Sequence, residues 1–148
     1  MVKNGLARNF MSDKVFLDTN ILVYCSDEND IQKQKKAREI VESLLKTHSG
    51  VISTQVLQEF YNVSTKKLKT EKSLAMKDVE DYSVAFPVHN NTPKDILSAI
   101  SISISTQYTI YDSLIIAAAK AEGCDVVYSE DLNDGQVVEG VKIENPLK

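Results

Sequence analysis

Hydrophobic positions along the chain fall into two alternating patterns. Short apolar runs typical of buried strands lie at residues 14–17, 51–53, 125–128 and 141–143, with a short extended piece at 86–88. Between these runs, apolar residues recur every three or four positions, which predicts helices at residues 20–25, 32–47, 54–68, 72–86, 93–105 and 112–122. The alternation predicts an α/β fold whose central, mostly parallel sheet has helices on both faces. The last strand is expected at an edge of that sheet.

One segment fits both patterns. Residues 100–105 alternate Ile and Ser as a strand would, yet Leu97, Ile100 and Ile104 also follow helical spacing. Ahead of them stand a capping residue, a proline at the first helical position and an acid in the first turn, in the sequence Thr-Pro-Lys-Asp at 92–95. This start signal favours a helix.

Length and composition predict a single domain. The chain has 148 residues, of which 43% are hydrophobic, enough for one core but too few for two. Residues 1–13 lack a core pattern and are interpreted as a tail, with Met11 as an alternative start to Met1, and the domain is expected to span 14–148. No apolar run approaches the roughly 18 residues of a membrane span, and no signal sequence is recognisable, so a cytoplasmic protein is expected.

Charge is distributed unevenly along the chain. The formal net charge of −4 argues against a protein that coats nucleic acid through bulk charge. Basic residues nevertheless gather in two runs, and each run alone could be a solvated helix face. Two basic runs flanking an acidic centre would also suit a polyanion that is held at its flanks and cut in the middle. The residues concerned are Lys33, Lys35, Lys36 and Arg38 in the first run, and Lys66, Lys67, Lys69 and Lys72 in the second.

Four acids are positioned to converge. Asp18 and Asp131 follow predicted strands, Asp112 opens a helix, and Glu59 lies about one turn into another helix beside its apolar face. Ligands of open α/β sheets bind at the carboxyl ends of the strands, so these side chains are expected around one cleft. Asp18 alone could equally be part of a helix cap.

Clustered carboxylates repel at neutral pH and therefore favour bound protons or cations. Hard oxygen ligands suit Mg²⁺ or Mn²⁺, and the sequence offers no His or Cys set of the kind that binds zinc. His48 and His89 are interpreted as surface or structural residues. A divalent ion at such a cluster can activate water and balance charge on a phosphodiester.

Four short motifs carry a resemblance to a known family. They are Leu17-Asp18-Thr19-Asn20, Gln58-Glu59-Phe60, Tyr111-Asp112-Ser113-Leu114-Ile115 and Tyr128-Ser129-Glu130-Asp131-Leu132. In order and approximate spacing, over residues 14–146, the chain resembles the PIN-domain ribonucleases. Within them it looks most like the VapC toxins of bacterial toxin-antitoxin pairs.

This resemblance implies roles for individual residues. Asp18, Glu59, Asp112 and Asp131 would bind Mg²⁺ or Mn²⁺, directly or through water. Asn20 and Ser129 would be supporting polar residues, and the extra acids Glu130 and Asp134 leave open whether Asp134 also contacts a metal. The resemblance further implies a sheet of about five strands, cleavage of single-stranded RNA leaving a 5′-phosphate, a homodimer and an antitoxin partner. The basic residues Lys33, Lys35, Lys36, Arg38, Lys66, Lys67 and Lys69 are the candidates for RNA binding.

Two other functions are considered. A phosphatase of the haloacid dehalogenase type also ends its first strand in Asp, but it needs a second Asp two residues later, where this chain has Asn20. A catalytically inactive PIN-fold module that binds RNA or protein is the second alternative. Acids at all four matching positions argue against it.

Overall fold

The computed structural model describes residues 13–148, so the predicted tail lies, apart from Asp13, outside the described residues. Six strands form one sheet in the order β3-β2-β1-β4-β6-β5, and every neighbouring pair is parallel except β5 and β6. The strands are β1 (Val15–Leu17), β2 (Gly50–Ser53), β3 (Val88–His89), β4 (Val126–Tyr128), β5 (Val137–Val138) and β6 (Val141–Glu144). The predicted α/β fold with a mostly parallel sheet is confirmed.

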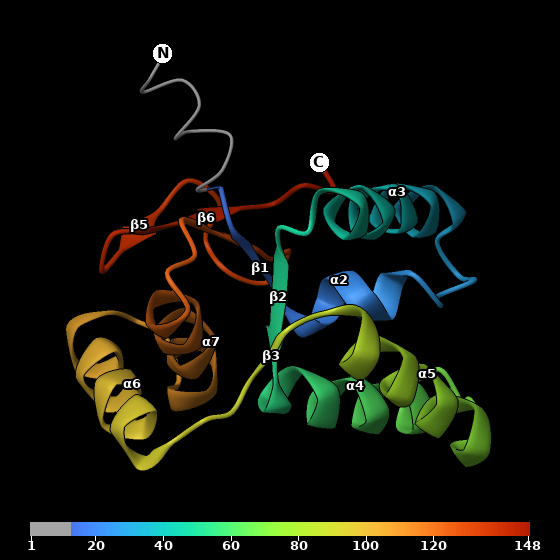
Figure 1. Ribbon diagram of the computed structural model, residues 1–148, viewed down its shortest axis with the longest axis horizontal. Helices are drawn as coiled ribbons and strands as arrows, with labels where there is room; N and C mark the ends of the chain where they lie inside the picture. The colour runs from blue at the N-terminus through green and yellow to red at the C-terminus, as the bar shows by residue number, and fades with distance from the viewer. Residues whose placement is uncertain (1–12) are drawn as a thin grey trace.

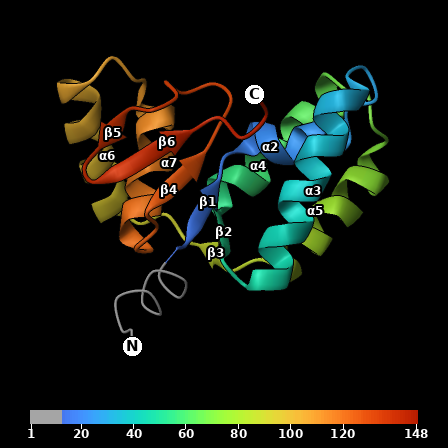
Figure 2. The ribbon, with the colours of Figure 1, turned by 90° about the horizontal axis from the view of Figure 1, so that it is seen from above.

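Helices cover both faces of this sheet. Figures 1 and 2 show α6 and α7 on one face, and α2, α3, α4 and α5 on the other. The helices are α2 (Thr19–Tyr24), α3 (Ile31–Thr47), α4 (Thr54–Lys66), α5 (Lys72–Ala85), α6 (Pro93–Ser105) and α7 (Ile110–Ala121). Because it is covered on both sides, the central strand β1 is apolar and buried at every position, with Phe16 and Leu17 fully inaccessible.

Side-chain caps explain where the helices begin. Asp18 caps α2 by accepting a hydrogen bond from the backbone N–H of Thr19, and Ser53 caps α4. Thr92 and Asp95 form a capping box at the start of α6, with Pro93 at its first position. The segment 100–105 is therefore helical, as this start signal predicts.

The strand count differs from the expected five because β5 was not predicted. Its two residues pair antiparallel with β6. The tight turn that joins β5 to β6 contains Glu139 and Gly140, which both have positive φ, at 52° and 81°. β5 occupies the edge of the sheet, so the prediction that 141–143 is an edge strand is wrong. Two residues are too few to show an alternating pattern, and the turn is the only local signal.

None of the helices between residues 13 and 148 combines the length and apolar character that a bilayer crossing requires.

Candidate active site

Asp18 lies at the carboxyl end of the central strand and is almost completely buried, with 6% of its surface exposed. Its Oδ1 accepts a hydrogen bond from the Thr19 N–H at 2.7 Å. Its Oδ2 accepts from Ser129 Oγ at 2.8 Å and from Asn20 Nδ2 at 3.1 Å. Burial raises the pKa of Asp18 to about 6; the hydrogen bonds from Ser129 and Thr19 oppose this rise, and the nearby charges of Glu59 and Asp131 add to it. The residue therefore caps α2 and also belongs to an acidic cluster.

Glu59 projects from α4 toward the same strand end, and both of its carboxylate oxygens are held. Thr19 Oγ1 donates to Oε1 at 2.6 Å, and Gln55 Nε2 donates to Oε2 at 3.2 Å. Gln55 Nε2 also donates to the carbonyl oxygen of Tyr111, at 3.0 Å. Gln55 thus connects α4 with the first turn of α7, which carries the next acid.

Asp112 stands in that first turn and is half-buried. Thr109 caps the helix by accepting from the Asp112 N–H at 3.1 Å. Burial raises the pKa of Asp112, the Thr109 hydroxyl lowers it, and the charges of Asp131 and Glu59 raise it further. Asp112 is thus close enough to Asp131 and Glu59 for their charges to affect it.

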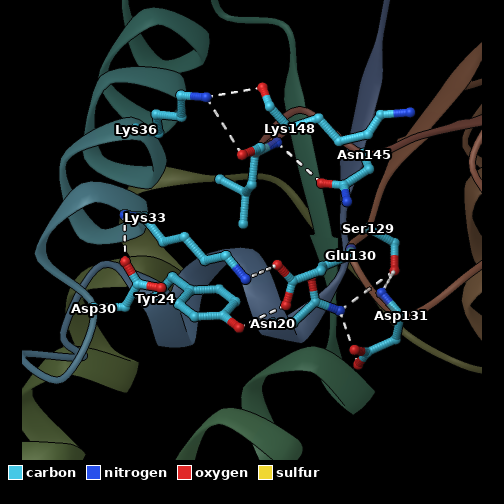
Figure 3. Close-up of polar contacts among 11 residues, drawn as sticks. Asn20, Tyr24, Asp30, Lys33, Lys36, Ser129, Glu130, Asp131, Asn145 and Lys148 are labelled. Atoms are coloured by element: carbon cyan, nitrogen blue, oxygen red, sulfur yellow. Dashed lines mark hydrogen bonds and ion pairs between the residues drawn. The ribbon is translucent and has the colours of Figure 1, made fainter.

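Asp131 lies on the loop that leaves β4, and Ser129 and Asn20 fix its position. Ser129 Oγ accepts from the N–H groups of Asp131 and Leu132, both at 3.2 Å, while it donates to Asp18. Asn20 Nδ2 donates to Asp131 Oδ2 at 3.2 Å and to Ser129 Oγ at 3.3 Å. Figure 3 marks both contacts with dashed lines. One amide group therefore spans the carboxylates of Asp18 and Asp131.

All four acids line one cleft of about 450 Å³, together with Asn20, Gln55, Lys67 and Glu130 among others. Within residues 13–148, no three Asp, Glu, His or Cys side chains are close enough to bind one ion directly. Mg²⁺ usually keeps several waters and takes only one or two protein carboxylates. A cleft lined by four carboxylates, two of them with a raised pKa, fits such a partly hydrated divalent ion.

Asp134 is not brought to this cleft. Its carboxylate accepts from the Asn145 N–H at 2.8 Å and pairs with Lys148, and neither partner lines the cleft. The turn around Ser129 directs Asp131 to the cleft and buries Leu132, and the chain then leads Asp134 away. The expectation of a supporting role for Asp134 in the site is therefore corrected.

The two basic runs differ in their surroundings. In the first run, Lys33 pairs with Glu130 at 2.5 Å, Lys36 Nζ donates to the Lys148 carbonyl at 2.8 Å, and Arg38 Nε donates to the Cys25 carbonyl at 2.8 Å. Of the four basic residues in this run, Lys35 is the exposed one that has no such partner within residues 13–148.

In the second run, Lys66, Lys67 and Lys69 are exposed, and Lys67 lines the cleft. No ion pair within residues 13–148 involves any of the three. This run is therefore exposed and, within residues 13–148, free of ion pairs, with Lys67 at the cleft.

Some residues of the site were not predicted. Thr19 and Gln55 orient Glu59, and Tyr24 and Glu130 line the cleft. Gln55 precedes Glu59 by four positions on the same helix, which puts both on one face, and this spacing is the signal that could have indicated it. Nothing in the sequence pairs Tyr24 with Glu130, since the two are 106 positions apart.

Comparison with solved structures shows where this fold occurs. VapC20 of Mycobacterium tuberculosis, a Sarcin-Ricin loop cleaving toxin, is 16% identical with a TM-score of 0.64, over 80% of this chain and 90% of the other. DNA-bound VapBC from Salmonella typhimurium is 20% identical with a TM-score of 0.67, over 89% and 97%. VapBC2 from Rickettsia felis, bound to a promoter fragment, is 20% identical with a TM-score of 0.66, over 88% and 96%. At sequence identities of 16% to 20%, the similarity shows a shared fold and no more.

The sequence itself gives a family. No curated protein matches the chain by sequence similarity. The family model of the PIN domain matches residues 15–135, a segment that contains all four acids of the cleft. Because this match spans most of the chain, the protein belongs to the PIN domain family, as the resemblance of its four motifs predicts.

Proposed function

We propose that the protein is a metal-dependent endoribonuclease that cleaves single-stranded RNA, and that it is the toxin of a toxin-antitoxin pair. The observation that carries the proposal is the convergence of Asp18, Glu59, Asp112 and Asp131, from four separate segments, on one cleft. Burying the charge of Asp18 beside other acids is costly to folding. Its role as the cap of α2 does not require the other three acids to lie beside it. Functional sites are where such perturbed groups gather.

The four acids would hold Mg²⁺ or Mn²⁺ directly or through water. When bound, the ion would lower the pKa of a water molecule and offset charge on the phosphodiester. Asp18, fixed by three donors, and Glu59, fixed by two, provide rigid carboxylates that need no rearrangement. In the proposed hydrolysis, water attacks phosphorus, the bond from phosphorus to the 3′ oxygen breaks, and the products are a 5′-phosphate and a 3′-hydroxyl.

A cleavage assay tests the proposal. End-labelled single-stranded RNA is incubated with the protein in Mg²⁺, in Mn²⁺ and in a chelator, and the product ends are mapped. We expect internal cuts with 5′-phosphates in either ion and none in the chelator. Binding of the RNA without cleavage under every condition would favour the inactive PIN-fold module instead.

The substrate path is proposed to run over the second basic run. Reversing the charges of Lys66, Lys67 and Lys69 to Glu should lower the salt dependence of single-strand binding, because each lost phosphate contact removes a slope of roughly 0.7. Binding is measured in chelator so that no RNA is cut. Lys94→Glu, at an exposed position on α6, is the control and should leave the slope unchanged. If the triple variant also keeps its slope, the run is a solvated face.

An antitoxin partner is supported by the fold neighbours, several of which are toxin-antitoxin complexes. The negative cleft would attract an Arg or Lys of such a partner at the site proposed for the ion. Expression in the native host without the neighbouring gene should arrest growth, and co-expression of that gene should restore it. Harmless expression of the protein alone would count against a toxin.

A homodimer is also proposed. It would cover the apolar side chains that α6 exposes, among them Leu97 at 67% and Ile104 at 79%.

A further inference from the structure

Glu130 is an acid of the cleft to which the proposed chemistry gives no role, and both of its carboxylate oxygens are occupied. Lys33 Nζ lies 2.5 Å from Oε2, and the Tyr24 hydroxyl donates to Oε1 at 2.5 Å. Lys33 also sits 5.0 Å from the centre of the Tyr24 ring. Figure 3 shows the three side chains meeting between helices α2 and α3 and the loop after β4. We call this group the Glu130 clamp.

The start of α3 sets the position of Lys33. Asp30 caps this helix by accepting from the Lys33 N–H at 3.0 Å, so the lysine leaves the first turn at a defined angle. Its ammonium group then reaches back over α2 to the loop. Lys33 and Glu130 are separated by almost a hundred positions in the sequence, so only the tertiary fold brings them together.

The main chain of Glu130 is fixed as well. Its N–H donates to Asn20 Oδ1 at 2.9 Å. The Nδ2 of the same Asn20 side chain reaches Asp18 at 3.1 Å and Asp131 at 3.2 Å. A shift of Glu130 would therefore move Asn20 and, with it, the amide that spans the two carboxylates.

We propose that the Glu130 clamp positions the loop of residues 129–131, so that Asp131 and Asn20 keep the arrangement that binds the divalent ion. The proposal rests on the function proposed above. Lys33 and Glu130 are partly exposed, at 35% and 21% of their side chains, and such ion pairs add little to folding stability. Their effect is on placement, to which the geometry of metal sites is sensitive within fractions of an ångström. Lys33 is then a positioning residue and not a contact to RNA phosphate.

Two substitutions distinguish this positioning role from a simple effect of charge, by the direction in which each changes Mg²⁺ affinity. Glu130→Gln removes a negative charge from the cleft, and by electrostatics alone it should weaken Mg²⁺ binding. Lys33→Met removes a positive charge, and by electrostatics alone it should strengthen Mg²⁺ binding. If the clamp positions the loop, both substitutions weaken binding.

Mg²⁺ binding is measured without RNA, from the rise in melting temperature of the full chain across an Mg²⁺ titration. The dissociation constant for Mg²⁺ is obtained by fitting this rise. We expect Lys33→Met and Glu130→Gln each to raise the dissociation constant by about tenfold, the lower range for partners that orient metal ligands. The double variant should bind Mg²⁺ no more weakly than the single variant with the larger effect, because both substitutions remove the same contact.

Tyr24→Phe should raise the dissociation constant by a smaller factor. Lys35→Met, at an exposed lysine on the same helix, is the control and should leave the dissociation constant unchanged.

Single-strand binding in chelator provides the second readout. Lys33→Met should keep the salt slope of the wild type, whereas a lost phosphate contact would lower it by roughly 0.7. The proposal is overturned if Lys33→Met lowers this slope, or if it tightens Mg²⁺ binding or leaves it unchanged. If the wild type neither binds Mg²⁺ nor cuts RNA, the proposed function fails and the clamp proposal with it. If the wild type does both and the variants match it, only the clamp proposal fails.

Discussion

Asp112→Asn is expected to abolish Mg²⁺-dependent RNA cleavage while leaving the metal-free protein at least as stable as the wild type. The substitution keeps the size of the side chain and removes one charge from the cluster. Loss of one preorganised electrostatic group costs about 100-fold or more in rate. The helix cap survives because it comes from Thr109, not from Asp112.

The expected gain in stability follows from the pKa of Asp112. Burial, together with Asp131 and Glu59, raises that pKa in the folded protein. A group with a raised folded pKa binds more protons when folded, so stability falls as pH rises from the unfolded to the folded pKa. The charged Asp112 is therefore unfavourable at neutral pH, and removing its charge relieves the repulsion.

Thermal melts in chelator and in Mg²⁺, together with the cleavage assay, test both parts. Mg²⁺ should raise the melting temperature of the wild type and that of Asp112→Asn much less. Asp125→Asn, at an exposed position just before β4, is the control and should retain cleavage. A variant that melts well below the wild type in chelator would mean that Asp112 mainly stabilises the start of α7. A variant that still cuts RNA would refute the proposed site.

Local patterns were sufficient to predict most of the fold and the four acids of the cleft. Three of these acids are placed by features that neighbouring residues encode: Asp18 and Asp131 follow apolar strands, and Asp112 lies in the first turn of a helix that Thr109 caps. Parallel strands bring their carboxyl ends to one side, so these local positions determine a shared cleft. The strand β5 escaped prediction because two residues carry no periodicity.

Contacts between distant segments were not predictable in the same way. Asp131 and Asp134 both follow β4 in the sequence, and only the turn at Ser129 decides which of them faces the cleft. In the sequence, the first basic run indicates one positive surface. In the structure, Lys33 instead pairs with Glu130, and Lys36 donates to the Lys148 carbonyl. Both partners are more than ninety positions away in the sequence. Such pairings depend on tertiary packing, which a single sequence does not display.

Asp18 is expected to make the metal-free protein less stable as pH rises from about 4 to about 7. Its pKa is raised from 3.8 to about 6, chiefly by burial, so the folded state holds a proton that the unfolded state has lost over this interval. A difference of about two pKa units corresponds to a contribution on the order of 3 kcal/mol at neutral pH. The penalty is absent below the unfolded pKa and complete above the folded one.

Comparison with Asp18→Asn isolates this contribution. Other groups also titrate: the pKa of His89 is raised although burial opposes it, because Glu122 and Asp95 hydrogen-bond to its ring. Such groups affect both proteins alike and cancel in the difference. The substituted amide cannot accept from all three donors that hold Asp18, so Asp18→Asn loses some stability at every pH.

The prediction therefore concerns the pH dependence of the difference and not its size at one pH. Denaturant unfolding in chelator at several pH values should show the stability advantage of the wild type shrinking as pH rises. Saturating Mg²⁺ should remove this decline, because a bound cation favours the charged carboxylate. A difference that stays constant in chelator would mean that the hydrogen bonds from Ser129, Thr19 and Asn20 fully offset the burial of Asp18. The charge on this carboxylate would then cost the fold nothing, and its burial would not indicate a bound cation.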